Sequence, residues 1–267
     1  MRRFLRSHVG ATPLAGNQAH QFALSHALRI FEPNALYTLI PKNGCSTMRL
    51  SIALANGCID EPSQVSWIHA NNRSFPATTE SAFLADYTFV VIRCPYQRLY
   101  SVFMDKIVNI DVESWNLFDR TRRRVFPHEL TFRRFLKLIE GMPRQALDIH
   151  WRPQVDFLLF QEYDDYFGLE NFGAAEQTLR ERIGLTLVDS RPYLGHEISS
   201  VNKLEGVVGA ADLPAIELLM MKREGTLPDP ASMYDEGTFA ATASLYADDV
   251  AFHRDRIGQT PLMAHAA

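Results

Sequence analysis

The chain has 267 residues, of which 46% are hydrophobic and 22% are charged, and its formal net charge is -4. This length suits one large α/β domain with a buried core, and the composition excludes extended disorder. The negative charge offers no general attraction to nucleic acid or to an anionic membrane, so an anionic ligand needs a local basic site.

The cysteines and the N-terminus indicate a compartment. Cys45, Cys58 and Cys94 are too few and too scattered for a disulfide framework, and none forms a CxxC pair of the kind that binds zinc. The N-terminal arginines lack the apolar stretch of about 7–15 residues that a signal peptide needs. No window approaches the roughly 18 apolar residues of a membrane span. We expect a cytoplasmic protein with no membrane span, no metal site and no nucleic-acid partner; its oligomeric state has no sequence signal.

Two strand-to-helix units follow an N-terminal stretch of mixed polarity. We expect residues 1–34 to form an arm or a helix, and residues 35–267 to form a single domain. Residues 35–40 (ALYTLI) predict a strand, and residues 46–57 (STMRLSIALANG) predict a helix that starts at a serine and ends at a glycine. Residues 87–108 repeat this pattern, with Pro95 at the first position of the helix.

The rest of the chain is predicted to be mostly helical. We expect helices within 111–147, a third strand at 155–160 (VDFLLF), a helix at 174–184 and a final helix near 242–258. Because strand-to-helix units pair their strands in parallel, the fold class is α/β with a parallel sheet.

The turn in residues 40–50 (IPKNGCSTMRL) has the composition of an anion site. Lys42 supplies a charge, Gly44 lets the backbone approach a ligand, and Ser46 and Thr47 offer hydroxyl donors. A turn from a strand into a helix also presents backbone N–H groups and the positive end of the helix dipole. The alternative is a capped helix with an incidental lysine. The GxxxxGK[ST] pattern of nucleoside-triphosphate P-loops is absent from this turn, because its lysine precedes the glycine.

Arg93 offers a second anion site. An arginine at the carboxyl end of a parallel strand faces the ligand crevice of an open α/β sheet. Ser101 follows eight residues later, about two helical turns along. The alternative is that Arg93 and Arg98 pair with acidic neighbours such as Asp105. Two anion sites indicate a ligand with two separated phosphates.

Three segments in order resemble the carbohydrate sulfotransferases of the chondroitin and dermatan 4-O type. PKNGCSTMR (41–49) resembles their 5′-phosphosulfate loop, and VIRCPYQRLYSVFMDK (91–106) resembles their 3′-phosphate segment. DIHWRPQ (148–154) is similar to a family segment with the pattern Asp-x-His-Trp-x-Pro-Gln. The chain departs from the family at Met48, where an aromatic residue is usual, and at Cys94, where an aspartate is common.

The resemblance implies a P-loop-like three-layer fold, with a central parallel β-sheet flanked by helices. It also implies that the chain transfers a sulfuryl group from 3′-phosphoadenosine 5′-phosphosulfate (PAPS) to a hydroxyl of a carbohydrate or another hydroxyl-bearing acceptor. The residues that it implies for donor binding are Lys42, Asn43, Gly44, Cys45, Ser46, Thr47, Arg93 and Ser101.

Catalysis by such an enzyme would require an in-line displacement and no metal. We expect Lys42 to stabilise the bridging oxygen of the leaving bisphosphate. We expect His150 to take the proton of the acceptor hydroxyl, because it lies in the third matching segment and histidine titrates near neutral pH. His69, His128 and His196 are alternatives for this base.

The sequence leaves alternatives open for two segments and for the function of the whole protein. Trp151 is expected either to stack on a sugar or to be buried, and the arginine-rich stretch 120–137 either to bind an anionic glycan or to form a solvated helix face. For the whole protein, the alternatives are a P-loop kinase that uses ATP and a non-catalytic nucleotide- or glycan-binding protein.

Overall fold

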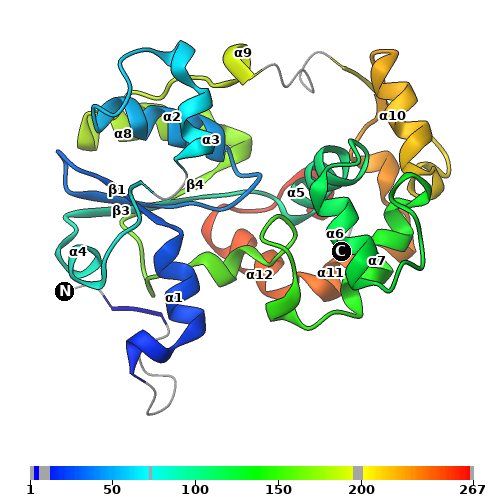
Figure 1. The fold of residues 1–267 in the computed structure, drawn as a ribbon, viewed down its shortest axis with the longest axis horizontal. Coiled ribbons are helices and arrows are strands. Elements are labelled where there is room, and N and C mark those ends of the chain that lie inside the picture. The colour runs from blue at the N-terminus through cyan, green and yellow to red at the C-terminus, as the bar shows by residue number, and fades with distance from the viewer. Residues whose placement is uncertain (1–2, 6–12, 72–73, 195–200, 265–267) are drawn as a thin grey trace. The chain divides into compact units, whose positions relative to one another are not determined.

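A computed structural model describes residues 3–5, 13–71, 74–194 and 201–264 of the chain (Figure 1). The chain divides into two compact units. Unit 1 consists of the described residues of 1–93 and 153–196, and unit 2 of those of 94–152 and 197–267.

A four-stranded sheet forms the centre of unit 1. Its order is β1 (Ala27–Ile30), β2 (Ala35–Thr38), β3 (Tyr87–Ile92) and β4 (Asp165–Gly168). Strands β2, β3 and β4 run parallel, and β1 pairs antiparallel with β2. Every residue of β2 and β3 is buried, as expected for parallel strands that are covered on both faces.

Helices cover both faces of this sheet. On one face lie α2 (Cys45–Ala55), α3 (Ser66–Ala70) and α8 (Phe172–Ile183), and on the other lie α1 (Gln18–Ser25) and α4 (Thr79–Leu84) (Figure 1). Met48 and Ile52 of α2 pack in one buried cluster with Tyr37 and Phe89 of the sheet. The second segment of this unit also contains a short helix, α9 (Arg191–Leu194). The predicted α/β fold, P-loop-like with a central and mostly parallel sheet flanked by helices, is confirmed.

The outer edge of β1 is covered by a short segment around Pro76. The Arg29 N–H donates to the Phe75 carbonyl at 2.9 Å, and the Ala77 N–H donates to the Ala27 carbonyl at 2.7 Å. Pro76 itself forms an isolated bridge with Leu28 of the strand. The segment therefore occupies backbone groups that an edge strand would otherwise expose.

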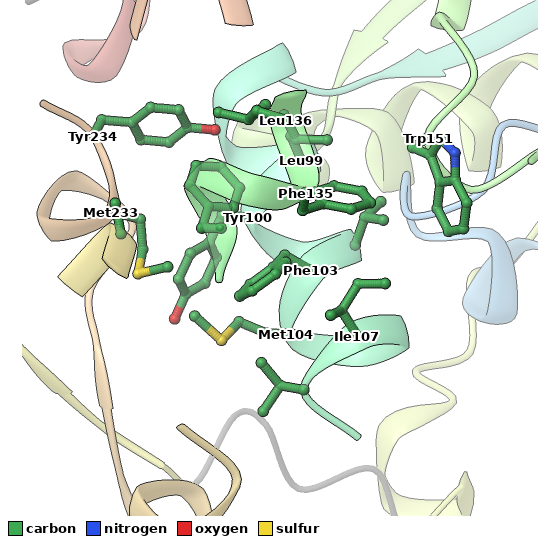
Figure 2. Close-up of a cluster of buried hydrophobic side chains, with 14 of the residues drawn as sticks. Leu99, Tyr100, Phe103, Met104, Ile107, Phe135, Leu136, Trp151, Met233 and Tyr234 are labelled. Atoms are coloured by element: carbon green, nitrogen blue, oxygen red, sulfur yellow. The ribbon is translucent and has the colours of Figure 1, made fainter. Parts of the chain in front are cut away.

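Unit 2 is mostly helical. Its helices are α5 (Pro95–Val102), α6 (Val112–Arg120), α7 (Phe132–Glu140), α10 (Ala215–Arg223), α11 (Glu236–Leu245), α12 (Ala247–Arg256) and α13 (Pro261–Ala264). Two short parallel strands, β5 (Asn202–Leu204) and β6 (Thr226–Pro228), accompany them. Side chains of α5 and α7 build a large buried cluster, to which Trp151 and Tyr234 also belong (Figure 2).

Several elements appear where the sequence predicts them. Helix α2 fills the helix predicted at 46–57, and Pro95 is the first residue of α5. The final helix near 242–258 is formed as two helices, α11 and α12. Within residues 1–34, the structure contains strand β1 as well as a helix.

The strand predicted at 155–160 is wrong. Gln154–Phe157 forms a 3₁₀ turn after Pro153, and the third parallel strand is β4, a few residues later. The apolar residues Phe157 and Phe160 are nevertheless buried, at 0% and 1% exposure. Only the end of the run pairs with another segment: Phe160 forms an isolated bridge with Phe4, and the Leu5 N–H donates to the Leu159 carbonyl at 2.9 Å. The run is buried without forming a strand, because an apolar run records burial and not backbone conformation.

Candidate active site

The turn between β2 and α2 has a backbone shape that few sequences can adopt. Lys42 and Gly44 both have left-handed backbones, with φ of 71° and 74°. A Cβ on Gly44 would lie 3.0 Å from Leu169 Cδ1 and 3.7 Å from Phe172 Cζ. Gly44 is thus required both by its conformation and by the close approach of the segment after β4.

The same turn directs N–H groups outward from the start of α2. Gly44 is the N-cap of the helix and has no side chain that could accept from them. The N–H groups of Cys45, Ser46 and Thr47 belong to the first helical turn, which has no intrahelical acceptors. Alternating left- and right-handed residues with such N–H groups form an anion-binding concavity, and the helix dipole adds to it.

Arg93 lies beside this turn, directly after β3. Its Nη1 donates to the carbonyl of Lys42 at 3.0 Å. Strands β2 and β3 are parallel neighbours, so their carboxyl ends bring Lys42 and Arg93 to the same edge of the sheet. The structure therefore joins the two segments that the sequence assigned to the two phosphates.

Hydrogen bonds of the Asn43 and Gln154 side chains connect the turn to β3 and Arg93. Asn43 is fully buried, and its Nδ2 donates to the Val91 carbonyl at 2.9 Å and to Gln154 Oε1 at 2.6 Å. Gln154 Oε1 also accepts from the Arg93 N–H at 3.0 Å, and its Nε2 donates to the Arg93 carbonyl at 2.9 Å. The side chain of Asn43 thus fixes the turn, and the matching segment at 148–154 contributes Gln154 to unit 1.

The hydroxyl groups of the turn differ in their surroundings. Thr47 Oγ1 lies 3.2 Å from Ser190 Oγ and accepts from the Ser190 N–H at 3.4 Å. Ser46 is half-buried in the first turn of α2. Cys45 is a half-buried free thiol that packs against the buried cluster of unit 1. Donor contacts by Ser46 and Thr47 remain predictions.

Ser101 and His150 lie in unit 2. Ser101 is half-buried in α5, one residue before its last residue, and a π-helical turn, Phe103–Ile107, follows directly. Such turns are rare inside helices, and those that occur often lie at functional sites. Donor contacts by Ser101 remain a prediction.

The His150 ring is held by a carboxylate. Its Nδ1 lies 2.7 Å from Asp148 Oδ1, and the same oxygen accepts from the His150 backbone N–H at 2.9 Å. Glu113 Oε1 of α6 lies 3.8 Å from Nδ1, and the second Glu113 oxygen has no hydrogen-bond partner among the described residues. When Nδ1–H donates to Asp148, Nε2 carries the lone pair, which is the form a general base needs.

Charges around this ring are balanced by Lys106. Its Nζ lies 3.5 Å from Glu113 and 3.2 Å from Asp111. Burial alone would lower the pKa of Lys106, but the carboxylates around it outweigh burial and raise it. Burial likewise would raise the pKa of Asp148, but the hydrogen bonds from His150 lower it. Asp148 is therefore ionised over the physiological range.

Buried groups hold the backbone directly after His150. Arg98 is 2% exposed, and its Nη1 donates to the Arg152 carbonyl at 2.9 Å. The Tyr246 hydroxyl donates to the Trp151 carbonyl at 2.6 Å. Trp151 is 2% exposed and packs against Phe135 in the buried cluster, as Figure 2 shows. Trp151 therefore belongs to the core, which is the second of the two alternatives that the sequence left open.

The other predicted histidines have different surroundings. His69 is exposed at the end of α3, His128 is exposed on a 3₁₀ turn beside Phe126, and His196 lies outside the described residues. Among the described residues, no group of three His, Cys, Asp or Glu side chains is arranged to hold a metal ion. None of the helices in the described part combines the length and apolar character of a membrane span.

Sequence reasoning missed three residues of the site. Asp148 and Gln154 lie in a segment that the sequence singled out, where the Asp-x-His spacing was the available signal. Glu113 had no such signal, because only the fold brings α6 next to His150.

Comparison with known proteins agrees with this geometry. Neither the curated proteins nor the solved structures contain a match to the chain. The sequence model of the sulfotransferase family matches residues 26–186, which include the whole sheet of unit 1, the turn into α2, Arg93, Ser101 and the segment with His150. With more than half of its residues matched, the chain belongs to the sulfotransferase family.

Proposed function

We propose that this chain transfers the sulfuryl group of PAPS to a hydroxyl of a carbohydrate. Its membership of the sulfotransferase family supports sulfuryl transfer in general. The choice of PAPS rests on one observation, the left-handed turn at Lys42 and Gly44 that opens the N–H groups of α2 beside Arg93. N–H groups, a lysine and an arginine at one edge of a sheet suit a ligand with separated anionic groups.

The proposed roles follow from the chemistry of each side chain. Lys42 and the first-turn N–H groups, with Ser46, hold the 5′-phosphosulfate, and Lys42 neutralises charge on the bridging oxygen as its bond to sulfur breaks. Arg93 and Ser101 hold the 3′-phosphate. Asn43 and Gln154 keep the turn in shape, so that no reorganisation is needed during the reaction.

His150 is the proposed general base. Its Nε2 takes the proton as the acceptor oxygen forms its bond to sulfur, and 3′-phosphoadenosine 5′-phosphate leaves on the opposite side. Asp148 orients the ring and stabilises its charged form after proton transfer. Such a displacement requires no metal ion.

The acceptor class and the location are part of the same proposal. A carbohydrate acceptor rests on the resemblance of three segments to carbohydrate sulfotransferases. A cytoplasmic location is supported by the three cysteines, which are all free thiols.

The deciding experiment is calorimetric titration with 3′-phosphoadenosine 5′-phosphate, beside ATP and 5′-AMP. We expect binding that requires the 3′-phosphate and that weakens in Lys42→Ala and Arg93→Ala. The matched controls are Lys137→Ala and Arg254→Ala, which remove exposed charges of unit 2. A preference for ATP would refute the PAPS assignment in favour of a kinase. Binding without transfer to any acceptor, unchanged in His150→Ala, would indicate a non-catalytic protein.

A further inference from the structure

Trp151 combines a buried aromatic ring with a hydrogen-bond donor whose acceptor is not a protein group nearby. The residue is 2% exposed and packs edge to face against Phe135, with 5.5 Å between the ring centroids. Its Nε1 is buried as well and has no hydrogen-bond partner among the described residues. Figure 2 shows this nitrogen on the edge of the ring that faces away from Phe135. Because buried indole N–H groups usually have an acceptor, this one requires an explanation.

Trp151 lines a small cavity inside unit 2. The volume of this cavity is about 10 Å³, which is the space that the centre of a single water molecule requires. Polar side chains border it together with the indole, namely those of Asn116, Arg120 and Asp148. A water molecule inside a protein needs about two to four polar partners. The cavity therefore has both the size and the chemistry to bind one water molecule.

Asp148 offers an acceptor at this cavity. Its Oδ1 lies 2.7 Å from Nδ1 of the His150 ring and accepts from the His150 backbone N–H at 2.9 Å. In the described ranges of the chain, no donor contacts its other oxygen, Oδ2. Arg120, which borders the same cavity, donates from Nη1 to the carbonyl of Ala146. A carboxylate oxygen is a strong acceptor, so Oδ2 suits a water molecule that the Trp151 indole also contacts.

We propose that one buried water molecule in this cavity links Trp151 to the carboxylate that holds His150. The water accepts from the Trp151 Nε1–H and donates to Asp148 Oδ2, while Asp148 Oδ1 accepts from Nδ1–H of His150. Trp151 is then a positioning residue, which acts through Asp148 and touches neither the donor nor the acceptor substrate. This inference rests on the proposed function for the role of His150 and adds a residue to its site.

The link controls which nitrogen of the His150 ring carries the proton. In a neutral histidine this choice depends on the hydrogen bonds that the ring nitrogens make. Glu113 Oε1 lies 3.8 Å from Nδ1, which is too far for a hydrogen bond, so among the described residues Asp148 is the acceptor that keeps the proton on Nδ1. With donors on both of its oxygens, the Asp148 carboxylate has less freedom to turn away from the ring. The lone pair of Nε2 then stays available for the acceptor hydroxyl.

The same link gives a reason for the sequence DIHW at 148–151. Asp148 supplies the carboxylate, His150 the ring and Trp151 the donor on the far side of the carboxylate. A phenylalanine at position 151 would also fill the apolar cluster around Phe135, but it has no N–H. The tryptophan therefore contributes a hydrogen bond in addition to packing.

The water molecule is tested by NMR on the full chain with ¹⁵N-labelled tryptophan. The chain has three tryptophans, and the variants Trp67→Phe, Trp115→Phe and Trp151→Phe assign their indole signals. We expect the Trp151 indole proton to exchange slowly with solvent and yet to show a nuclear Overhauser effect to water. The indole of Trp115, which is 45% exposed, should exchange rapidly. A slowly exchanging Trp151 proton without that effect would overturn the proposal, and so would exchange as rapid as that of Trp115.

The positioning role is tested by Trp151→Phe, which keeps an aromatic ring and removes the N–H. The ring ¹⁵N shifts of His150, assigned with His150→Ala, report which nitrogen carries the proton. We expect the fraction with the proton on Nδ1 to fall, and kcat to fall about fivefold, as for the loss of one ordinary hydrogen bond. Trp67→Phe and Trp115→Phe make the same change elsewhere and should alter neither quantity. If Trp151→Phe also leaves both unchanged, Trp151 has only a packing role and the proposal is wrong.

Titration with 3′-phosphoadenosine 5′-phosphate separates this inference from the proposed function. Trp151→Phe should bind that ligand as the unaltered chain does, because Trp151 is not part of the donor site. If the ligand binds and the His150 ring is unaffected by Trp151→Phe, the inference fails and the proposed function stands. If the ligand does not bind even to the unaltered chain, the proposed function fails, whereas the water molecule and its effect on the His150 ring are still decided by NMR.

Discussion

Gly44→Ala offers a direct test of the turn geometry. An alanine there would occupy a left-handed backbone at φ 74°, which costs about 1–2 kcal/mol. Its Cβ would also lie 3.0 Å from Leu169 Cδ1, so that Leu169 must shift, and overpacking of this kind costs roughly 1–3 kcal/mol. We expect the free energy of unfolding to fall by about 2–5 kcal/mol, together with the affinity for 3′-phosphoadenosine 5′-phosphate.

Two further variants isolate the contact with Leu169. Gly184→Ala has the same backbone problem at φ 65° but meets nothing within 4 Å, so its cost should stay near 1–2 kcal/mol. In a Leu169→Ala background, Gly44→Ala should cost no more than Gly184→Ala does. Urea titrations of these variants supply the free energies. The reasoning is refuted if Gly44→Ala and Gly184→Ala cost the same in the unaltered chain.

Three other changes test the remaining geometry. Asp148→Asn should lower kcat about 10²–10³-fold with donor affinity unchanged, because the carboxylate that orients the His150 ring is gone. An unaltered kcat in steady-state assays would contradict this role. Gln154→Leu should lower the free energy of unfolding by about 2–4 kcal/mol in urea titrations, because it leaves buried donors and acceptors unpaired. A loss below about 0.5 kcal/mol would argue against a stabilising role of the Gln154 hydrogen bonds. Hydrogen bonds from Arg133 and from a backbone N–H lower the pKa of Asp235. Its ionised form therefore stabilises the fold at pH values above the usual aspartate pKa. This stability is lost as the pH falls below that value and through the lowered pKa. Arg133→Ala should therefore lower the midpoint of thermal unfolding more at pH 7 than at pH 2, and the loss should stay below about 1 kcal/mol because both groups are largely exposed.

Local signals in the sequence were sufficient for much of the fold. The helix α2 and the start of α5 at Pro95 follow from residue preferences within a few positions, so they could be predicted. Strand β4 could not, because DYFG is short and its pairing with β3 comes from residues far away in the chain. The apolar run at 155–160 led to a wrong prediction because its residues are buried without forming a strand, and only Phe160 pairs, in an isolated bridge with Phe4.

The candidate site was predictable in the same partial way. Lys42 and Arg93 stand out because each follows a strand, and parallel strands bring their ends to one edge. The contact of Glu113 with His150 joins positions 37 residues apart and needs the tertiary structure. The sequence also left two alternatives for Trp151, stacking on a sugar or burial, and only the packing of unit 2 shows that its side chain is buried.

The segment that covers β1 has a consequence for how the chain behaves at high concentration. Edge strands that expose their backbone groups are templates for pairing with another chain, which leads to aggregation or strand exchange. At this edge, the Phe75 carbonyl and the Ala77 N–H already bond to the Arg29 N–H and the Ala27 carbonyl. Pro76 between them has no N–H that could bond to another strand. Growth of the sheet past β1 would first require the segment around Pro76 to detach, so this side of the sheet is protected against self-association.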